Sequence, residues 1–183
     1  MENTLNLPLI SKRYHGDVVE LIFNKPLGFS FVPGECVEIY DNDQEFRIYS
    51  IASGVQQDSL SFIIKKLPQG KVSSWLYDEV KEGDVLRISN ESHGFFRVGE
   101  TDKPFVFIAT GTGIAPFISY IQSNTEPYQK QPEEIIYGVR YMEESIEVPS
   151  TIKTTYCLSA DQKEHPSIHI GRVTSYLKEN KAD

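Results

Sequence analysis

Several residue types are scarce in this chain of 183 residues, and each scarcity excludes a class of protein. The two cysteines, Cys36 and Cys157, are too few for a disulfide scaffold or a zinc site. Both lie in apolar, strand-like runs, so we expect two core thiols. The longest uninterrupted apolar run, residues 105–109, is far shorter than the ~20 residues of a membrane-spanning helix. Because residues 1–4 are polar and unlike a signal peptide, we expect a cytoplasmic protein with no membrane association.

Positive charge is also in short supply. Lys and Arg number 18 against 26 Asp and Glu, which gives a net charge of −8. Residues 1–100 carry 10 against 15 and residues 101–183 carry 8 against 11, so both parts are acidic. Neither has the cationic field that nucleic acids or acidic membranes require, and we expect no nucleic-acid partner. We also expect no metal site, because Pro166 separates His165 from His169 and indicates loop residues.

The first half of the chain has the pattern of an antiparallel β-domain. Short alternating runs are separated by turns rich in glycine and proline, which is typical of a small barrel or sandwich. A helix is expected at residues 72–80, after Gly70. The expected strands are residues 5–12, 18–24, 35–40, 46–53, 59–66 and 85–92.

The second half changes period. An apolar strand (105–109), a glycine loop and a helix (114–123) precede two strands (134–140 and 154–159) and a last helix (173–180). This order is the signature of a parallel α/β unit. Since a complete doubly wound domain carries five or six strands, three strands indicate a truncated sheet. We place the boundary at residues 100–104, between domains 1–100 and 101–183.

The glycine loop Thr110-Gly111-Thr112-Gly113 is the first candidate binding motif. Glycines let the backbone approach a diphosphate, and the start of the following helix directs N–H groups and a positive dipole toward it. Pro116 fits the first turn of that helix, where its missing N–H costs nothing. The alternative is an ordinary tight turn between a strand and a helix.

A second motif, Arg-Ile-Tyr-Ser, occupies an alternating strand at residues 47–50. Arg47 and Tyr49 share one face of that strand, with Ser50 on the other. Arginine can bind phosphate with two hydrogen bonds, and tyrosine offers a surface on which an aromatic ring stacks. The alternative is that Arg47 pairs with Asp43 or Glu45 and that Tyr49 belongs to the core.

A second helix start follows Gly70, in the run Gly70-Lys71-Val72-Ser73. Its dipole could hold another phosphate. The alternative is simple capping by Ser73 or Ser74, since serine is a preferred cap.

The order of these motifs along the chain resembles the ferredoxin–NADP reductase family. Arg-x-Tyr-Ser, Gly-Lys-x-Ser, Gly-Phe-Phe at residues 94–96 and Gly-Thr-Gly-Ile-Ala-Pro follow one another at similar spacing, nearest to the bacterial ferredoxin/flavodoxin reductases. The resemblance implies an antiparallel Greek-key FAD-binding barrel followed by a parallel α/β NAD(P)-binding domain. It implies an enzyme that passes electrons between NADPH and a ferredoxin or flavodoxin by hydride transfer at flavin N5. The alternative is a flavin-binding electron-transfer subunit, or a degenerate module, that no longer uses pyridine nucleotide.

The resemblance also implies roles for individual residues. In the barrel, Arg47 contacts the FAD diphosphate, while Tyr49 and Ser50 are the catalytic pair: one stacks on the flavin and the other hydrogen-bonds near its N5. Further cofactor-binding residues come from the strand that passes FAD, from the helix start that holds its diphosphate and from the loop that receives the nucleotide diphosphate. These residues are Ile63, Ile64, Lys65, Gly70, Lys71, Val72, Ser73, Thr110, Gly111, Thr112 and Gly113.

Specificity for the 2′-phosphate of NADPH depends on three positions. Arg140 and Arg172 match two arginines of the family, whereas Ala160, after Ser159, stands where the third would be. We expect NADPH to be preferred with reduced discrimination, and NADH to remain possible; the alternative for both arginines is a solvated surface. The chain stops before the family's C-terminal strand motif, which places hydride transfer in question. Lys65, Lys66 and Lys71 form the densest basic patch, either a docking site for an acidic redox protein or a solvated face.

Overall fold

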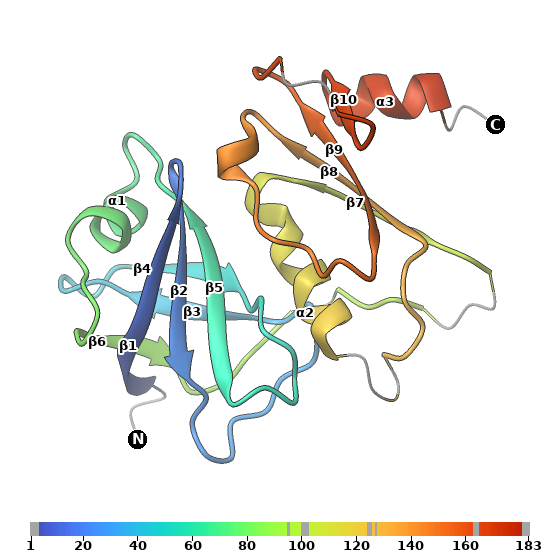
Figure 1. Cartoon of the computed structure of the whole chain (residues 1–183). Helices are drawn as coiled ribbons and strands as arrows, with labels where there is room; N and C mark the ends of the chain where they lie inside the picture. The colour runs from blue at the N-terminus through green and yellow to red at the C-terminus, as the bar shows by residue number, and fades with distance from the viewer. Residues whose placement is uncertain are drawn as a thin grey trace.

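Two sheets of different type divide the chain, as Figure 1 shows in a computed structural model that describes residues 4–94, 96–99, 103–123, 126, 128–162 and 165–180. The first sheet is antiparallel and six-stranded, and the second is parallel and four-stranded. The expected fold class is therefore confirmed. The first sheet contains β1 (Thr4–His15), β2 (Val18–Asn24), β3 (Cys36–Tyr40), β4 (Phe46–Ser50), β5 (Ser59–Lys65) and β6 (Val85–Ser89), with helix α1 (Lys71–Asp78) between β5 and β6.

The antiparallel sheet closes on itself as a barrel. Its order is β4-β3-β6-β1-β2-β5, and a bridge between Ile51 and Phe62 joins the two outer strands. Alternation places Val37 and Ile39 of β3 in the core, so their neighbours point outward. β4 ends at Ser50, three residues earlier than expected, because Ile51 and Ala52 pair with Phe62 and Ser61 of β5 instead of continuing the ladder with β3.

Helix α1 lies against one end of the barrel and is fixed there by Lys12 of β1. The Lys12 ammonium donates hydrogen bonds to the carbonyl oxygens of Tyr77 (2.8 Å) and Val80 (2.6 Å), at the C-terminal end of the helix. A cation at this end also complements the helix dipole. At the opposite, N-terminal end of α1, Lys71 forms ion pairs with Asp43 and Glu45 of the loop between β3 and β4.

The parallel sheet has one strand more than the sequence predicts. Its elements are β7 (Val106–Thr110), the 3-10 turn η1 (Gly111–Ile114), α2 (Ala115–Ser123), β8 (Glu134–Val139), η2 (Met142–Glu144), β9 (Lys153–Leu158), β10 (Ile168–Ile170) and α3 (Val173–Asn180). The order is β10-β9-β8-β7, so the expected three strands were too few. The missed strand, β10, has only three residues and gives no periodic signal.

Helices cover both faces of the parallel sheet. Ile135 and Tyr137 of β8 lie in the same cluster as α2, whereas Ile136 packs with Cys157 and Val173 at the start of α3. Every residue of β8 is buried, as expected for a strand with helices on both faces. No helix within the described residues is long and apolar enough to cross a membrane.

The barrel and the parallel sheet share a hydrophobic cluster. Val18, Ala52 and Ile63 come from the barrel side and pack with the residues around α2. Figure 1 shows α2 between the two sheets. The two sheets are therefore joined by packing as well as by the linking chain. Of the expected boundary at residues 100–104, residues 100–102 lie outside the described residues.

Two smaller expectations were wrong. Cys157 is buried, but Cys36 is only half-buried, because alternation in β3 turns it outward and its thiol donates to the His93 carbonyl oxygen (3.0 Å). His169 is not a loop residue; it pairs with Cys157 in β10, although His165 does lie in a loop.

Candidate functional site

Arg47 lies on the exposed outer strand β4 without an acidic partner. Its guanidinium donates a hydrogen bond to the Phe46 carbonyl oxygen (2.7 Å), and no carboxylate of the described residues is within ion-pair distance. Asp43 and Glu45, the partners considered in the sequence, are occupied elsewhere. A solvent-facing arginine fork on a rigid strand is available to an anion.

Tyr49 and Ser50 complete this strand. Tyr49 packs against the barrel core, and burial raises the pKa of its phenol to about 12, opposed by the Arg47 charge. The phenol is therefore neutral at physiological pH. Ser50 lies opposite Cys36 in the ladder, half-buried, and no side chain in the described part of the chain hydrogen-bonds its hydroxyl. The neutral ring and the unengaged hydroxyl therefore lie on opposite faces of β4.

The N-terminal end of α1 is uncapped. Gly70 is the N-cap residue, and no side chain hydrogen-bonds the first-turn N–H groups. Ser73 and Ser74 are inside the helix, where their hydroxyls bond Leu67 and Gly70 instead. Capping by either serine was the wrong alternative, because the helix begins at Lys71. Free N–H groups at this end suit an anion.

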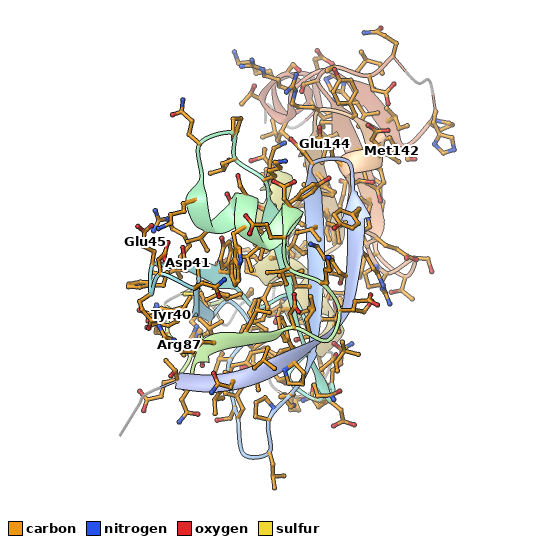
Figure 2. The ribbon with its side chains drawn as sticks, turned by 90° about the vertical axis from the view of Figure 1, so that its left-hand side faces the viewer. Tyr40, Asp41, Glu45, Arg87, Met142 and Glu144 are labelled. Atoms are coloured by element: carbon orange, nitrogen blue, oxygen red, sulfur yellow. The ribbon has the colours of Figure 1, made fainter. Side chains whose placement is uncertain are left out.

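Lys71, the first residue of α1, is already paired with carboxylates. Its ammonium lies 2.9 Å from Asp43 Oδ2 and 3.1 Å from Glu45 Oε1, with Asp41 Oδ2 at 3.9 Å. Hydrogen bonds to Asp43 and Glu45 raise the pKa of Lys71. Figure 2 shows Asp41 and Glu45 together on this side of the barrel. The β3–β4 loop thus supplies the counter-charges that the sequence suggested for Arg47.

The other two lysines of the basic patch are paired as well. Lys66 lies 2.7 Å from Asp78, and Lys65 lies 3.0 Å from Asp17 and 3.3 Å from Glu144. Burial lowers the pKa of Lys65, but its hydrogen bonds to the two carboxylates outweigh burial and raise it. The patch is therefore largely neutralised, which favours the solvated-face interpretation over docking.

Four of the expected FAD-binding residues have buried side chains. Ile63, Ile64, Val72 and Ser73 are each less than a tenth exposed, and the three apolar ones pack in the two cores. Only their backbone groups are available to a ligand. The hydrophobic residues of the motifs pack in the core, whereas Lys65, at the end of β5, is only half-buried.

The glycine loop after β7 leaves open space above its backbone. Gly111 has a φ of +51°, a conformation that favours glycine, and a Cβ at Gly111 or Gly113 would meet no atom of the described part of the chain within 4 Å. Thr110 precedes η1 without a side-chain cap, and Thr112 lies inside the turn. The loop has room for a bulky ligand group close to its backbone.

A cavity of about 330 Å³ opens at this loop, between the parallel sheet and the barrel. Arg140 and Arg172 line it, both exposed and without an ion pair to any described carboxylate. Lys65 lines it from the barrel side, where it bonds Glu144; Figure 2 shows Glu144 and Met142 beside the β1–β2 turn. The cavity brings together residues from both sheets: Lys65, Thr110, Gly111, Gly138, Val139, Arg140, Glu144, Cys157, Ser159, Arg172, Val173 and Thr174.

Sequence reasoning missed several residues of this cavity. Glu144 has no motif, and only the fold brings it to Lys65. Gly138 had a readable signal, a glycine in the middle of a buried strand, and the structure gives its reason: a Cβ there would lie 2.6 Å from Val173 Cγ2. The close packing of β8 against α3 sets the floor of the cavity.

The chain thus combines a barrel that carries an exposed arginine on its outer strand with a parallel α/β unit that carries a glycine loop and two exposed arginines. Residues 17–96 match the family "Oxidoreductase FAD-binding domain". Among curated proteins, the toluate 1,2-dioxygenase electron transfer component of Pseudomonas putida is 28% identical over 81% of this chain and 46% of its own length. Methane monooxygenase component C of Methylosinus trichosporium is 31% identical over 74% of this chain and 42% of its own length.

A solved structure extends the likeness to the whole fold. A ferredoxin NADP+ reductase from Neisseria gonorrhoeae, with bound FAD and NADP, has a TM-score of 0.80 at 19% identity, over 99% of this chain and 78% of that one. The resemblance inferred from the motifs is confirmed in two respects: the chain has the fold of the ferredoxin NADP+ reductase structure, and residues 17–96 match the oxidoreductase FAD-binding domain. It spans about half the length of the curated relatives it matches.

Proposed function

We propose that this chain binds FAD on its barrel (residues 1–100) and a pyridine nucleotide on its α/β unit (residues 101–183), and transfers electrons between NADPH and a ferredoxin or flavodoxin. The observation that carries the proposal is the cavity that Lys65 of the barrel shares with Thr110, Gly111 and the two arginines of the parallel sheet. A nucleotide bound there is in contact with both parts of the protein.

The residues of the barrel fit FAD on three counts. Arg47 is an exposed cation without a carboxylate partner among the described residues, α1 begins with free N–H groups, and Tyr49 presents a neutral ring. We assign the diphosphate to Arg47 and the α1 start, the isoalloxazine to Tyr49, and the hydrogen bond near N5 to Ser50. Bound FAD would supply the redox chemistry, accepting a hydride and releasing electrons one at a time. The protein binds and orients it.

The α/β unit fits NADPH better than NADH. We assign the nucleotide diphosphate to the loop Gly111–Thr112–Gly113 and the 2′-phosphate to Arg140 and Arg172, with Ser159 beside them. Each arginine can form charge-assisted hydrogen bonds of about 1.5–3 kcal/mol to a phosphate. With Ala160 in the third position, the preference for NADPH is weaker than three arginines would give.

We take the partner to be a one-electron carrier, because a flavin that has accepted a hydride can release its electrons one at a time. Two relatives are named as components of oxygenase systems, the electron transfer component of toluate 1,2-dioxygenase and a reductase component of naphthalene 1,2-dioxygenase that acts on ferredoxin. Those names support a ferredoxin over a flavodoxin. The paired lysines argue against docking through a strongly basic face.

Two measurements test the proposal. The purified protein should release FAD on denaturation, and anaerobic NADPH should bleach its visible flavin absorbance. A colourless protein that takes up no added FAD refutes the whole assignment. A yellow protein that no nucleotide bleaches supports the alternative, a flavin-binding subunit that does not use pyridine nucleotide.

A further inference from the structure

Buried hydrogen bonds join the loop that follows β4 to helix α2. We call this contact, formed by Ser53, Ser119 and Ser123, the serine seam. Ser53, three residues after Ser50, accepts a hydrogen bond at its carbonyl oxygen from the Ser119 hydroxyl of α2 (2.7 Å). One turn later the Ser123 hydroxyl accepts the Val55 N–H (3.1 Å) and donates to the Ser119 carbonyl oxygen (2.7 Å). Ser53, Ser119 and Ser123 are each at most 1% exposed.

At Gly54, the loop backbone lies so close to the backbone of α2 that there is no room for a side chain. An ideal Cβ at Gly54 would lie 2.6 Å from the carbonyl oxygen of Gln122 and 2.8 Å from its carbonyl carbon. Gly54 does not have a positive φ, so space alone excludes a side chain. Moving from 2.6 Å to an ordinary contact of 3.4 Å requires a shift of 0.8 Å, and the obstacle is helix backbone that cannot rotate away.

The seam connects the two elements that carry the proposed cofactor sites. The 51–55 loop continues directly from β4, and α2 continues directly from the Gly111–Ile114 turn. Ser53 is also tied to its own barrel, since its hydroxyl accepts the Ser61 N–H (3.2 Å). Neither serine of α2 lines the nucleotide cavity. We therefore expect a substitution at the seam to change the distance between the two proposed cofactor sites and to leave the lining of each site unchanged.

We propose that Gly54 and Ser119 are positioning residues that set the distance between flavin and nicotinamide in this protein, an inference that rests on the proposed function. Reaction rates are sensitive to this distance, because a misplacement of about 1 Å can cost on the order of a hundredfold. The 0.8 Å shift that an alanine at Gly54 demands is of this size.

The test compares Gly54→Ala and Ser119→Ala with Gly99→Ala, a control at a glycine without a positive φ, where an added methyl group would meet no atom of the described residues within 4 Å. We expect the affinities for FAD and for 2′-phospho-AMP, the half of NADPH that carries the 2′-phosphate, to stay within about twofold of wild type. Anaerobic single-turnover reduction of the flavin by NADPH should slow by roughly tenfold to a hundredfold in Gly54→Ala and less in Ser119→Ala. Gly99→Ala should behave as wild type. Unchanged reduction rates in both seam variants, or a parallel loss of FAD affinity, overturn the proposal.

A second readout does not depend on cofactors. The Val55 N–H is held by Ser123, so hydrogen exchange in a peptide covering residues 51–58 reports the seam directly. We expect faster exchange in Gly54→Ala and Ser119→Ala and no change in Gly99→Ala. Wild-type protein that binds no FAD refutes the proposed function, whereas unchanged exchange in both seam variants refutes the seam whatever the cofactor result.

Discussion

Replacing Arg47 by alanine should weaken FAD binding far more than replacing Lys71, although both residues belong to motifs for the same diphosphate. The Arg47 guanidinium has no carboxylate partner within the described residues, so its charge is available. Charge-assisted hydrogen bonds to a phosphate contribute about 1.5–3 kcal/mol, which corresponds to about tenfold to 150-fold in affinity. Stacking on Tyr49 contributes about 0.5–1.5 kcal/mol beyond burial, so Tyr49→Ala should cost less than Arg47→Ala.

Lys71 differs because Asp43 and Glu45 already hold its ammonium at 2.9 and 3.1 Å. We expect Lys71→Ala to change FAD affinity by no more than about fivefold, as for an exposed ion pair. The double variant Asp43→Asn/Glu45→Gln should bind FAD more tightly, since it frees Lys71 and removes negative charge near the diphosphate. In that background, Lys71→Ala should cost more than it does in the wild type.

The assay is fluorescence titration of the apo-protein with FAD at low and high salt. Lys66→Ala is the matched control, a lysine paired with Asp78 at the other end of α1. Arg47→Ala should show a shallower salt dependence than wild type, because one counter-charge to the phosphate is gone. Equal losses in Arg47→Ala and Lys71→Ala, or no gain in the double variant, would refute the reasoning.

Three further predictions concern other parts of the chain. Ala160→Arg should tighten NADPH binding by about tenfold or more and leave NADH binding unchanged, because only NADPH carries the 2′-phosphate. Single-turnover flavin reduction by each nucleotide measures this, and equal effects on both nucleotides would show that the pocket is misassigned. Burial raises the pKa of Glu35, but hydrogen bonds from Val32, Ser92 and Arg97 outweigh burial and hold the pKa below its usual value. The ionised Glu35 therefore stabilises the folded protein above the pKa it has in the unfolded chain, and this stabilisation is lost as pH falls through the lower, folded pKa. The Tm of Glu35→Gln should consequently fall less than that of wild type between neutral and acidic pH, and parallel curves would contradict this. Burial raises the pKa of Cys157 to about 11, so a thiol reagent at about pH 8 should label half-buried Cys36 first, and the reverse order in mass spectra would count against the burial of Cys157.

Local patterns were sufficient for the type and order of most helices and strands. Alternation along residues 46–50 places Arg47 and Tyr49 on one face of a strand, and glycine after a buried strand predicts the turn at residues 111–114. The same logic failed at β10, where three residues are too few for a period. It also left Ser73 or Ser74 open as the α1 cap, since propensity does not tell at which residue the helix begins.

The fold class, the order of the two parts and the motifs of the proposed FAD and nucleotide sites can be read from the amino-acid sequence, because each depends on residues close together in the chain. How the charges and backbones meet depends on the folded chain. Asp43 and Glu45 pair with Lys71 and not with Arg47, Glu144 reaches Lys65, and Gly54 abuts α2. These contacts join residues 26 to 79 positions apart in the chain, and no local pattern encodes a partner at such separation.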